Sequence, residues 1–144
     1  MIPAFNSEGD LPVGVHGATL DDVLSRFGQP SSGRRIVAAR LERVYRLAMG
    51  TGHVERFVVF GSFVTNKHEP NDVDLTLVMD DTFDLSLVSG EARLLFDHQV
   101  ADSHFGTSIF GVRRMAAFGG EQAMVAFWQR RRDGKLRGIV EIVG

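Results

Sequence analysis

Apolar residues recur at steps of three and four along much of the chain, the spacing that places them on one face of a helix. The helices that this spacing and its boundary residues predict cover residues 20–26, 34–49, 89–96 and 121–132. Thr19 lies three residues before Asp22, the spacing of a capping box at the start of the first helix. Gly50 and Gly52 follow the longest helix, where a left-handed residue is expected to end it. Residues 130–132 are arginines that we expect to end the last helix, where cations suit its dipole.

Short runs rich in β-branched and aromatic residues separate these helices. The strands that the runs predict cover residues 56–60, 72–79, 107–112 and 138–143. The run at 56–60 is apolar on both faces, as in a central strand, and the run at 138–143 is expected at an edge. Residues 1–17 show no sustained period and predict an irregular N-terminal arm. The order of elements predicts a single α/β (α+β) domain over residues 1–144, with a small mixed sheet flanked by helices.

Composition narrows the function classes. The chain has 16 Lys and Arg against 18 Asp and Glu, a net charge of −2, so the molecule as a whole has no strong field to attract nucleic acid. It has no cysteine, which excludes disulfides, thiolate catalysis and metal sites built on sulfur. No apolar run approaches the ~20 residues of a membrane span, and residues 1–10 do not resemble a signal peptide. We therefore expect a cytoplasmic protein without a membrane partner, in which any metal binds through oxygen or imidazole.

Two carboxylates open the predicted strand at 72–79. Strand alternation places Asp72 and Asp74 on one face, with Cα atoms about 7 Å apart, while the residues between and after them face the core. Unpaired, these carboxylates repel each other and resist joint ionisation. Mg²⁺, held by one or two carboxylates together with substrate phosphates, removes that conflict. Taken alone, such a pair is more often a turn or a surface pair than a metal site.

A glycine and a serine end the strand before this pair. At Gly61 and Ser62, a turn into a helix would aim backbone N–H groups at an anion. Glycine permits close approach of a phosphate, and serine adds a hydroxyl donor. Although each motif alone is weak, together they predict a nucleotide site in which amides contact phosphates and carboxylates hold the metal.

The order of strand, Gly61-Ser62, short connection and Asp72-x-Asp74 resembles the polymerase-beta-like nucleotidyltransferase superfamily, in particular its minimal bacterial members. The resemblance implies a nucleotidyltransferase-like fold in which Gly61 and Ser62 bind the phosphates of a nucleoside triphosphate. It also implies that Asp72 and Asp74 are catalytic and hold Mg²⁺, with room for two ions. Further segments are similar to a small uncharacterised bacterial family of this fold, which has no settled substrate: residues 11–16, 18–21, 61–65 and 137–142.

The chain departs from the superfamily pattern at two places. The superfamily usually has a cation soon after the Gly-Ser pair, and here Thr65 occupies that place. Lys67 is therefore the candidate nucleotide-binding cation, although a solvated loop lysine is equally consistent with the sequence. The superfamily also has a third carboxylate on the next strand, where residues 107–110 offer hydroxyls instead. Asp102 is the nearest candidate for this catalytic role, and it serves only if the strand begins earlier than residue 107.

Two hypotheses follow. The first is an enzyme that moves a nucleoside monophosphate from a nucleoside triphosphate to a hydroxyl of a protein, a tRNA or a small molecule. The alternative is a catalytically degenerate module of the same fold that binds a nucleotide or a partner protein, for example in a toxin–antitoxin or defence pair. A third interpretation is that Asp72 and Asp74 form a polar strand end in an unrelated domain. The sequence leaves the acceptor, the preferred base and the oligomeric state open.

Overall fold

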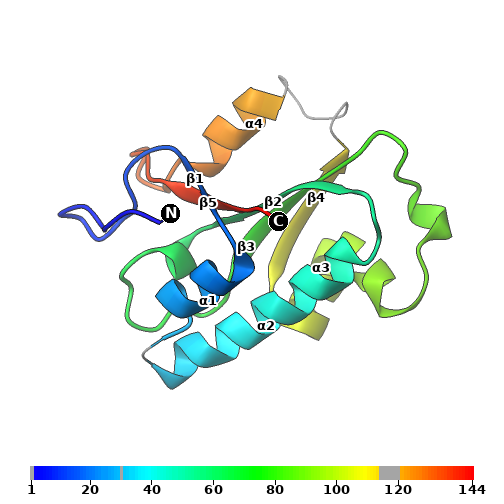
Figure 1. Cartoon of the computed structure of the whole chain (residues 1–144), viewed down its shortest axis with the longest axis horizontal. Helices are drawn as coiled ribbons and strands as arrows, with labels where there is room; N and C mark the ends of the chain where they lie inside the picture. The colour runs from blue at the N-terminus through cyan, green and yellow to red at the C-terminus, as the bar shows by residue number, and fades with distance from the viewer. Residues whose placement is uncertain (1, 30, 114–120) are drawn as a thin grey trace.

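The computed structural model describes residues 2–29, 31–113 and 121–144, which form a five-stranded mixed sheet with helices on its two faces (Figure 1). The strands are β1 (Val15–Ala18), β2 (Val54–Phe60), β3 (Asp74–Met79), β4 (Ser108–Arg113) and β5 (Ile139–Ile142). The α-helices are α1 (Leu20–Phe27), α2 (Ser32–Met49), α3 (His98–Phe105) and α4 (Glu121–Trp128). Three 3₁₀ helices are η1 (Ser62–Val64), η2 (Leu85–Leu87) and η3 (Gly90–Phe96). The predicted α/β (α+β) class is confirmed.

The strand order is β1-β5-β2-β3-β4. β2 is antiparallel to both of its neighbours, whereas β1 pairs with β5 and β3 pairs with β4 in parallel. The prediction of β2 as a central strand is confirmed. The prediction of an edge strand at 138–143 is wrong, because β1 covers the outer side of β5 with Val15 opposite Ile139. β1 comes from the predicted irregular arm at 1–17; with four residues and Gly17 among them, it carries little strand signal of its own.

The two predicted N-terminal helices are confirmed. Thr19 and Asp22 form the predicted capping box, with reciprocal hydrogen bonds of 3.1 and 3.2 Å between side chains and backbone amides. Gly50 at the end of α2 is right-handed, with φ of −64°, so the expected left-handed residue is not there. Gly52, the other glycine of the prediction, has the left-handed φ of +77°. β2 begins at Val54, two residues before the strand predicted over 56–60.

The second half of the chain contains the larger corrections. Residues 90–96 form 3₁₀ helix η3 rather than an α-helix, and α3 follows where no helix was predicted. α4 ends at Trp128, so the arginines at 130–132 lie beyond the helix and do not complement its dipole. Arg131 instead forms an ion pair with Asp10, 2.8 Å apart, which ties the C-terminal segment to the N-terminal arm.

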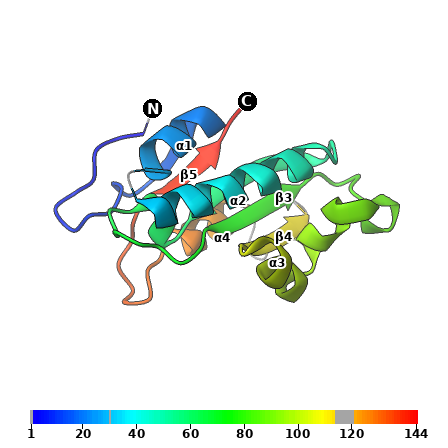
Figure 2. The same ribbon diagram turned by 90° about the horizontal axis from the view of Figure 1, so that it is seen from below.

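The main core lies between the sheet and the α1–α2 pair (Figure 2). Side chains at alternate positions of β3 point into it: Leu75, Leu77 and Met79. The intervening positions of β3, beginning with Asp74, therefore face the other side of the sheet. On that side Trp128 of α4 packs against Phe60 of β2, with ring centroids 4.5 Å apart. α1 and α2 cover one face of the sheet, and α3 and η3 add buried side chains to the same core. The polar start of β3 lies on the opposite face, the face on which α4 packs.

Candidate functional site

The two carboxylates predicted as a metal site lie together at one end of the sheet. Asp74, the first residue of β3, pairs with Phe60 of β2 on one side and with Ser108 of β4 on the other. The Ser108 hydroxyl lies 3.4 Å from Oδ2 of Asp72 and also hydrogen-bonds the Asp74 carboxylate. The structure therefore brings Asp72 and Asp74 to one hydroxyl. Since β3 begins at Asp74, Asp72 belongs to the preceding loop and not to the strand predicted over 72–79.

The electrostatics of this pair depend on burial and on neighbouring charges. Burial raises the pKa of Asp74 to about 6, with a further contribution from the negative charge of Asp72. The guanidinium groups of Arg137 and Arg132 and the Ser108 hydroxyl act in the opposite direction on this pKa. Ionisation of Asp74 beside the charged Asp72 is therefore unfavourable in the folded chain.

The raised pKa of Asp74 predicts a pH-dependent effect of Asp74→Asn on stability. The folded state holds the proton of Asp74 more tightly than the unfolded chain, so the contribution of this group to the stability of the wild type falls between pH 4 and pH 6 as the carboxylate ionises. The asparagine variant carries no such penalty. Relative to the wild type, it is expected to gain about 1–2 kcal/mol of unfolding free energy from pH 4 to pH 7.5, after a discount for partial solvent screening.

Denaturant unfolding of both proteins at the two pH values, without divalent cations, measures this gain. Asp102→Asn, a change of the same kind at an exposed position of α3, is the control and should not show it. An Asp74→Asn variant whose stability relative to the wild type is the same at both pH values would contradict the expectation.

Gly61 lies directly against the carboxylate pair. Its φ is +81° and its ψ −165°, a conformation that L residues rarely adopt. A Cβ placed on Gly61 would lie 2.0 Å from Oδ2 of Asp74, so only glycine lets this carboxylate reach the turn. The helix expected after Ser62 is the single 3₁₀ turn η1, which ends when the Thr65 hydroxyl donates to the Ser62 carbonyl oxygen at 2.6 Å.

Arg34 of α2 holds the loop that carries these residues, and it was not among the predicted site residues. It is buried, and its guanidinium donates to backbone carbonyl oxygens of two segments: to Phe27 at 2.9 Å, Phe63 at 2.9 Å, Thr65 at 2.7 Å and Lys67 at 3.2 Å from Nε. The signal that could have revealed it is its position three residues before Val37, on the apolar face of the helix.

The two remaining predicted site residues do not join the carboxylate pair. Lys67 is exposed and lines a cavity between the loop, α1 and α2, not one shared with Asp74. Asp102 is an exposed residue of α3, and β4 begins at Ser108, so the earlier strand start that its catalytic role required is not found. Among the described residues, no group of three or more His, Asp or Glu side chains is placed to hold a metal.

Aromatic side chains border the pair on its side of the sheet. Trp128 packs against Phe110 of β4 as well as against Phe60, with centroids 4.9 Å apart in the Phe110 pair. Its indole N–H is buried and has no hydrogen-bond partner within the described parts of the chain. Phe127 is 62% exposed, so of the two aromatic residues on α4 only Trp128 packs on the sheet.

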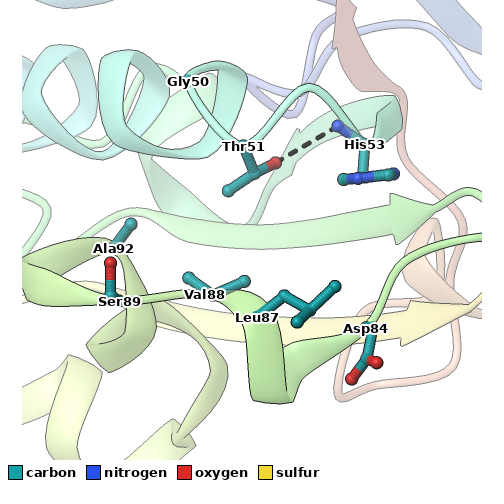
Figure 3. Close-up of a pocket in the computed structure, with 8 residues that line it drawn as sticks. All are labelled: Gly50, Thr51, His53, Asp84, Leu87, Val88, Ser89 and Ala92. Atoms are coloured by element: carbon teal, nitrogen blue, oxygen red, sulfur yellow. Dashed lines mark hydrogen bonds between the residues drawn. The ribbon is translucent and has the colours of Figure 1, made fainter.

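A separate hollow of about 280 Å³ lies near the opposite end of β3, where the α2–β2 connection faces η2 and η3 (Figure 3). Thr51 and His53 lie on one side and Leu87 on the other. His53 Nδ1 is 3.0 Å from the Asp80 carboxylate. Partial burial raises the pKa of Asp80, but hydrogen bonds from His53 and Thr82 outweigh it and hold this pKa below its usual value. None of the predicted site residues lines this hollow.

Comparison with known proteins assigns the chain to a family, and this family has no known activity. No curated protein and no solved structure matches this chain. Within the described residues, no helix has both the length and the apolar character needed to cross a membrane. One family of proteins matches residues 3–143, nearly the whole sequence. The chain therefore belongs to that family, the family of unknown function DUF6932.

Proposed function

We propose that this chain is a cytoplasmic, Mg²⁺-dependent nucleotidyltransferase of the polymerase-beta-like superfamily. It would move a nucleoside monophosphate from a nucleoside triphosphate to a hydroxyl of a protein, a tRNA or a small molecule. The observation that carries the proposal is the packing of Gly61 against Asp74, with Asp72 beside it on the same serine hydroxyl. The Gly61-Ser62 and Asp72-x-Asp74 parts of the motif are separated by a loop in the sequence, and the fold brings Gly61 into contact with Asp74.

The donor groups at this place fit a magnesium ion. Asp72 and Asp74 offer carboxylate oxygens and Ser108 a hydroxyl, the hard oxygen ligands that Mg²⁺ prefers. Mg²⁺ usually binds through one or two carboxylates and takes its other ligands from water and substrate phosphates, so a third acidic side chain is not needed for binding. When bound, the ion would supply charge neutralisation to the triphosphate.

The residues of the chain would then act mainly by position. Gly61 keeps a side chain out of the turn next to the carboxylates, and the Ser62 hydroxyl is available there as a donor to a phosphate oxygen. In the reaction, the acceptor oxygen bonds to the α-phosphorus in line with the bond that breaks. Pyrophosphate leaves, and the hydroxyl proton passes to water.

A second candidate function is a catalytically degenerate module that binds a nucleotide or a partner protein, as in a toxin–antitoxin or defence pair. Its support is the absence, among the described residues, of a third acidic or histidine side chain grouped with Asp72 and Asp74. Such a group is the usual general base of a transfer reaction. The nucleotide-binding form of this candidate keeps the nucleotide site without the transfer reaction, and the partner-binding form has neither.

Isothermal titration calorimetry with ATP, GTP, CTP and UTP tests the nucleotide site. At least one nucleotide is expected to bind in Mg²⁺ and to lose most of its affinity when the metal is chelated. Asp72→Ala should weaken the metal-dependent binding by about tenfold or more, because a charged oxygen ligand is lost. Asp21→Asn, at an exposed position in the first turn of α1, is the matched charge control and should bind as the wild type does.

Two outcomes would contradict the proposal. One is the absence of binding by all four nucleotides, which would favour the module that binds a partner protein. The other is binding that Asp72→Ala leaves unchanged, since the nucleotide would then lie away from the carboxylate pair. If binding is confirmed, transfer of label from an α-³²P nucleotide to a candidate acceptor separates the enzyme from the degenerate module.

A further inference from the structure

A cationic cavity lies on the α1–α2 side of the loop that follows η1. Its volume is about 250 Å³, and the polar side chains that line it include Arg26, Gln29, Arg34, Asn66, Lys67 and His68. Arg26 comes from α1, Arg34 from α2 and Lys67 from the loop, so three separate segments each contribute a cation. Among the described residues that line the cavity, none is Asp or Glu. The carboxylate pair faces the other side of the sheet.

The positive charges of this cavity are not neutralised by ion pairs. Among the described residues, Arg34 donates only to backbone carbonyl oxygens. Arg26 donates to the Pro3 carbonyl oxygen at 3.0 Å, and its guanidinium lies 4.5 Å from the centroid of the Phe5 ring. Within the described part of the chain, neither arginine nor Lys67 lies within ion-pair distance of a carboxylate.

The carboxylate of Glu69 lies close enough to Arg34 to affect the charge of the cavity. Burial lowers the pKa of Arg34, and the negative charge of Glu69 acts in the opposite direction. Glu69 is half exposed and does not line the cavity. Because this one solvated carboxylate acts on Arg34 and no acidic residue lines the cavity within the described residues, the three cations leave the cavity with a net positive charge.

The donors around the cavity suit an oxyanion with several acceptor atoms. An ammonium group, a guanidinium group and the amide N–H groups of Gln29 and Asn66 are all donors, and charge-assisted hydrogen bonds to phosphate are among the strongest in proteins. A small cavity with an uncompensated charge concentrates anions from solution. The chemistry selects a tetrahedral phosphate group over a carboxylate, because phosphate presents more oxygens to donors that come from three directions.

We propose that the cationic cavity is a binding site for a phosphate group, either free inorganic phosphate or the phosphoryl group of a small ligand. Lys67 is its principal contact, because its side chain is exposed and its ammonium, unlike the guanidinium groups of Arg26 and Arg34, makes no hydrogen bond to the described residues. The site does not depend on the proposed nucleotidyl transfer, since it uses neither Asp72 nor Asp74. Arg34 links the two places, because it binds the Phe63 carbonyl oxygen of η1 as well as the cavity loop.

Calorimetric titration with inorganic phosphate, in a chelator and at low ionic strength, tests the site. The wild type is expected to bind phosphate saturably, and Lys67→Met should weaken the binding by about tenfold or more through loss of one charged hydrogen bond. Lys67→Arg should restore most of the affinity. Lys135→Met is the matched control: Lys135 pairs with Glu8, does not line the cavity, and is the other lysine of the sequence. It should bind phosphate as the wild type does.

Further arms distinguish the sources of the phosphate and keep this proposal separate from the nucleotide site. Asp72→Ala should leave phosphate binding intact even if it abolishes nucleotide binding. Competition between phosphate and a metal-free nucleotide would identify a phosphoryl group of that ligand as an occupant, and its absence would identify the free anion. No saturable binding, equal losses in Lys67→Met and Lys135→Met, or dependence on Asp72 would each overturn the proposal.

Discussion

Arg34→Met is expected to lower the free energy of unfolding by about 3–5 kcal/mol, the largest effect of any single side chain outside the hydrophobic core. The guanidinium is buried and joins the end of α1 to the loop after η1 through the Phe27, Phe63, Thr65 and Lys67 carbonyl oxygens. Methionine fills a similar volume but donates nothing. Buried carbonyl groups are then left without partners, and each costs about 1–3 kcal/mol unless water reaches it.

Arg34→Lys is expected to recover only part of this loss. A lysine keeps the charge but presents one donor group in place of the planar fork, so it cannot reach carbonyl oxygens on both segments at once. Arg46→Met is the control on the same helix: Arg46 is exposed and pairs with Glu42 at 2.6 Å, and such pairs contribute at most about 1 kcal/mol. Urea unfolding of the variants gives the values. A loss in Arg34→Met no larger than in Arg46→Met would show that the loop is held by other contacts.

The parts of the fold that the sequence predicts are those with a local signal. The capping box at Thr19 and Asp22 is formed by neighbours in the chain, and β2 is recognisable because both of its faces are apolar. The closeness of the carboxylate pair was predicted from strand alternation over 72–79, but Asp72 lies in the loop before β3, and its position follows from the Ser108 hydroxyl of the neighbouring strand. The capping box and the central strand needed no knowledge of which elements pack together.

The parts that the sequence does not predict depend on distant partners. β1 is a strand because β5 pairs with it in parallel, more than a hundred residues later in the chain. The position of β5 inside the sheet follows from the same pairing. Lys67 follows the glycine turn closely in sequence, yet the loop carries it toward α1 and α2 rather than toward Asp74. Arg34 directs that path from a helix that lies earlier in the chain, so no local pattern around Lys67 reveals it.

Gly61→Ala is expected to disable the candidate site and to cost about 3 kcal/mol of stability. Two effects add. The backbone at φ +81° and ψ −165° is a region of about 1–3 kcal/mol strain for a residue with a side chain. The added methyl group would lie 2.0 Å from Oδ2 of Asp74, so the carboxylate must turn away from the Ser108 hydroxyl. Metal-dependent nucleotide binding, if present in the wild type, should be lost.

Gly52→Ala separates the two effects. Gly52 also has a positive φ, +77°, but a Cβ there meets no atom within 4 Å, so this variant carries backbone strain without a clash. It should lose stability while its nucleotide binding stays intact. Since the clash in Gly61→Ala needs the Asp74 carboxylate, Gly61→Ala should cost less in an Asp74→Ala background, by about 1 kcal/mol or more in a double-mutant cycle. Additive losses in that cycle would mean that the turn and the carboxylate do not act on each other.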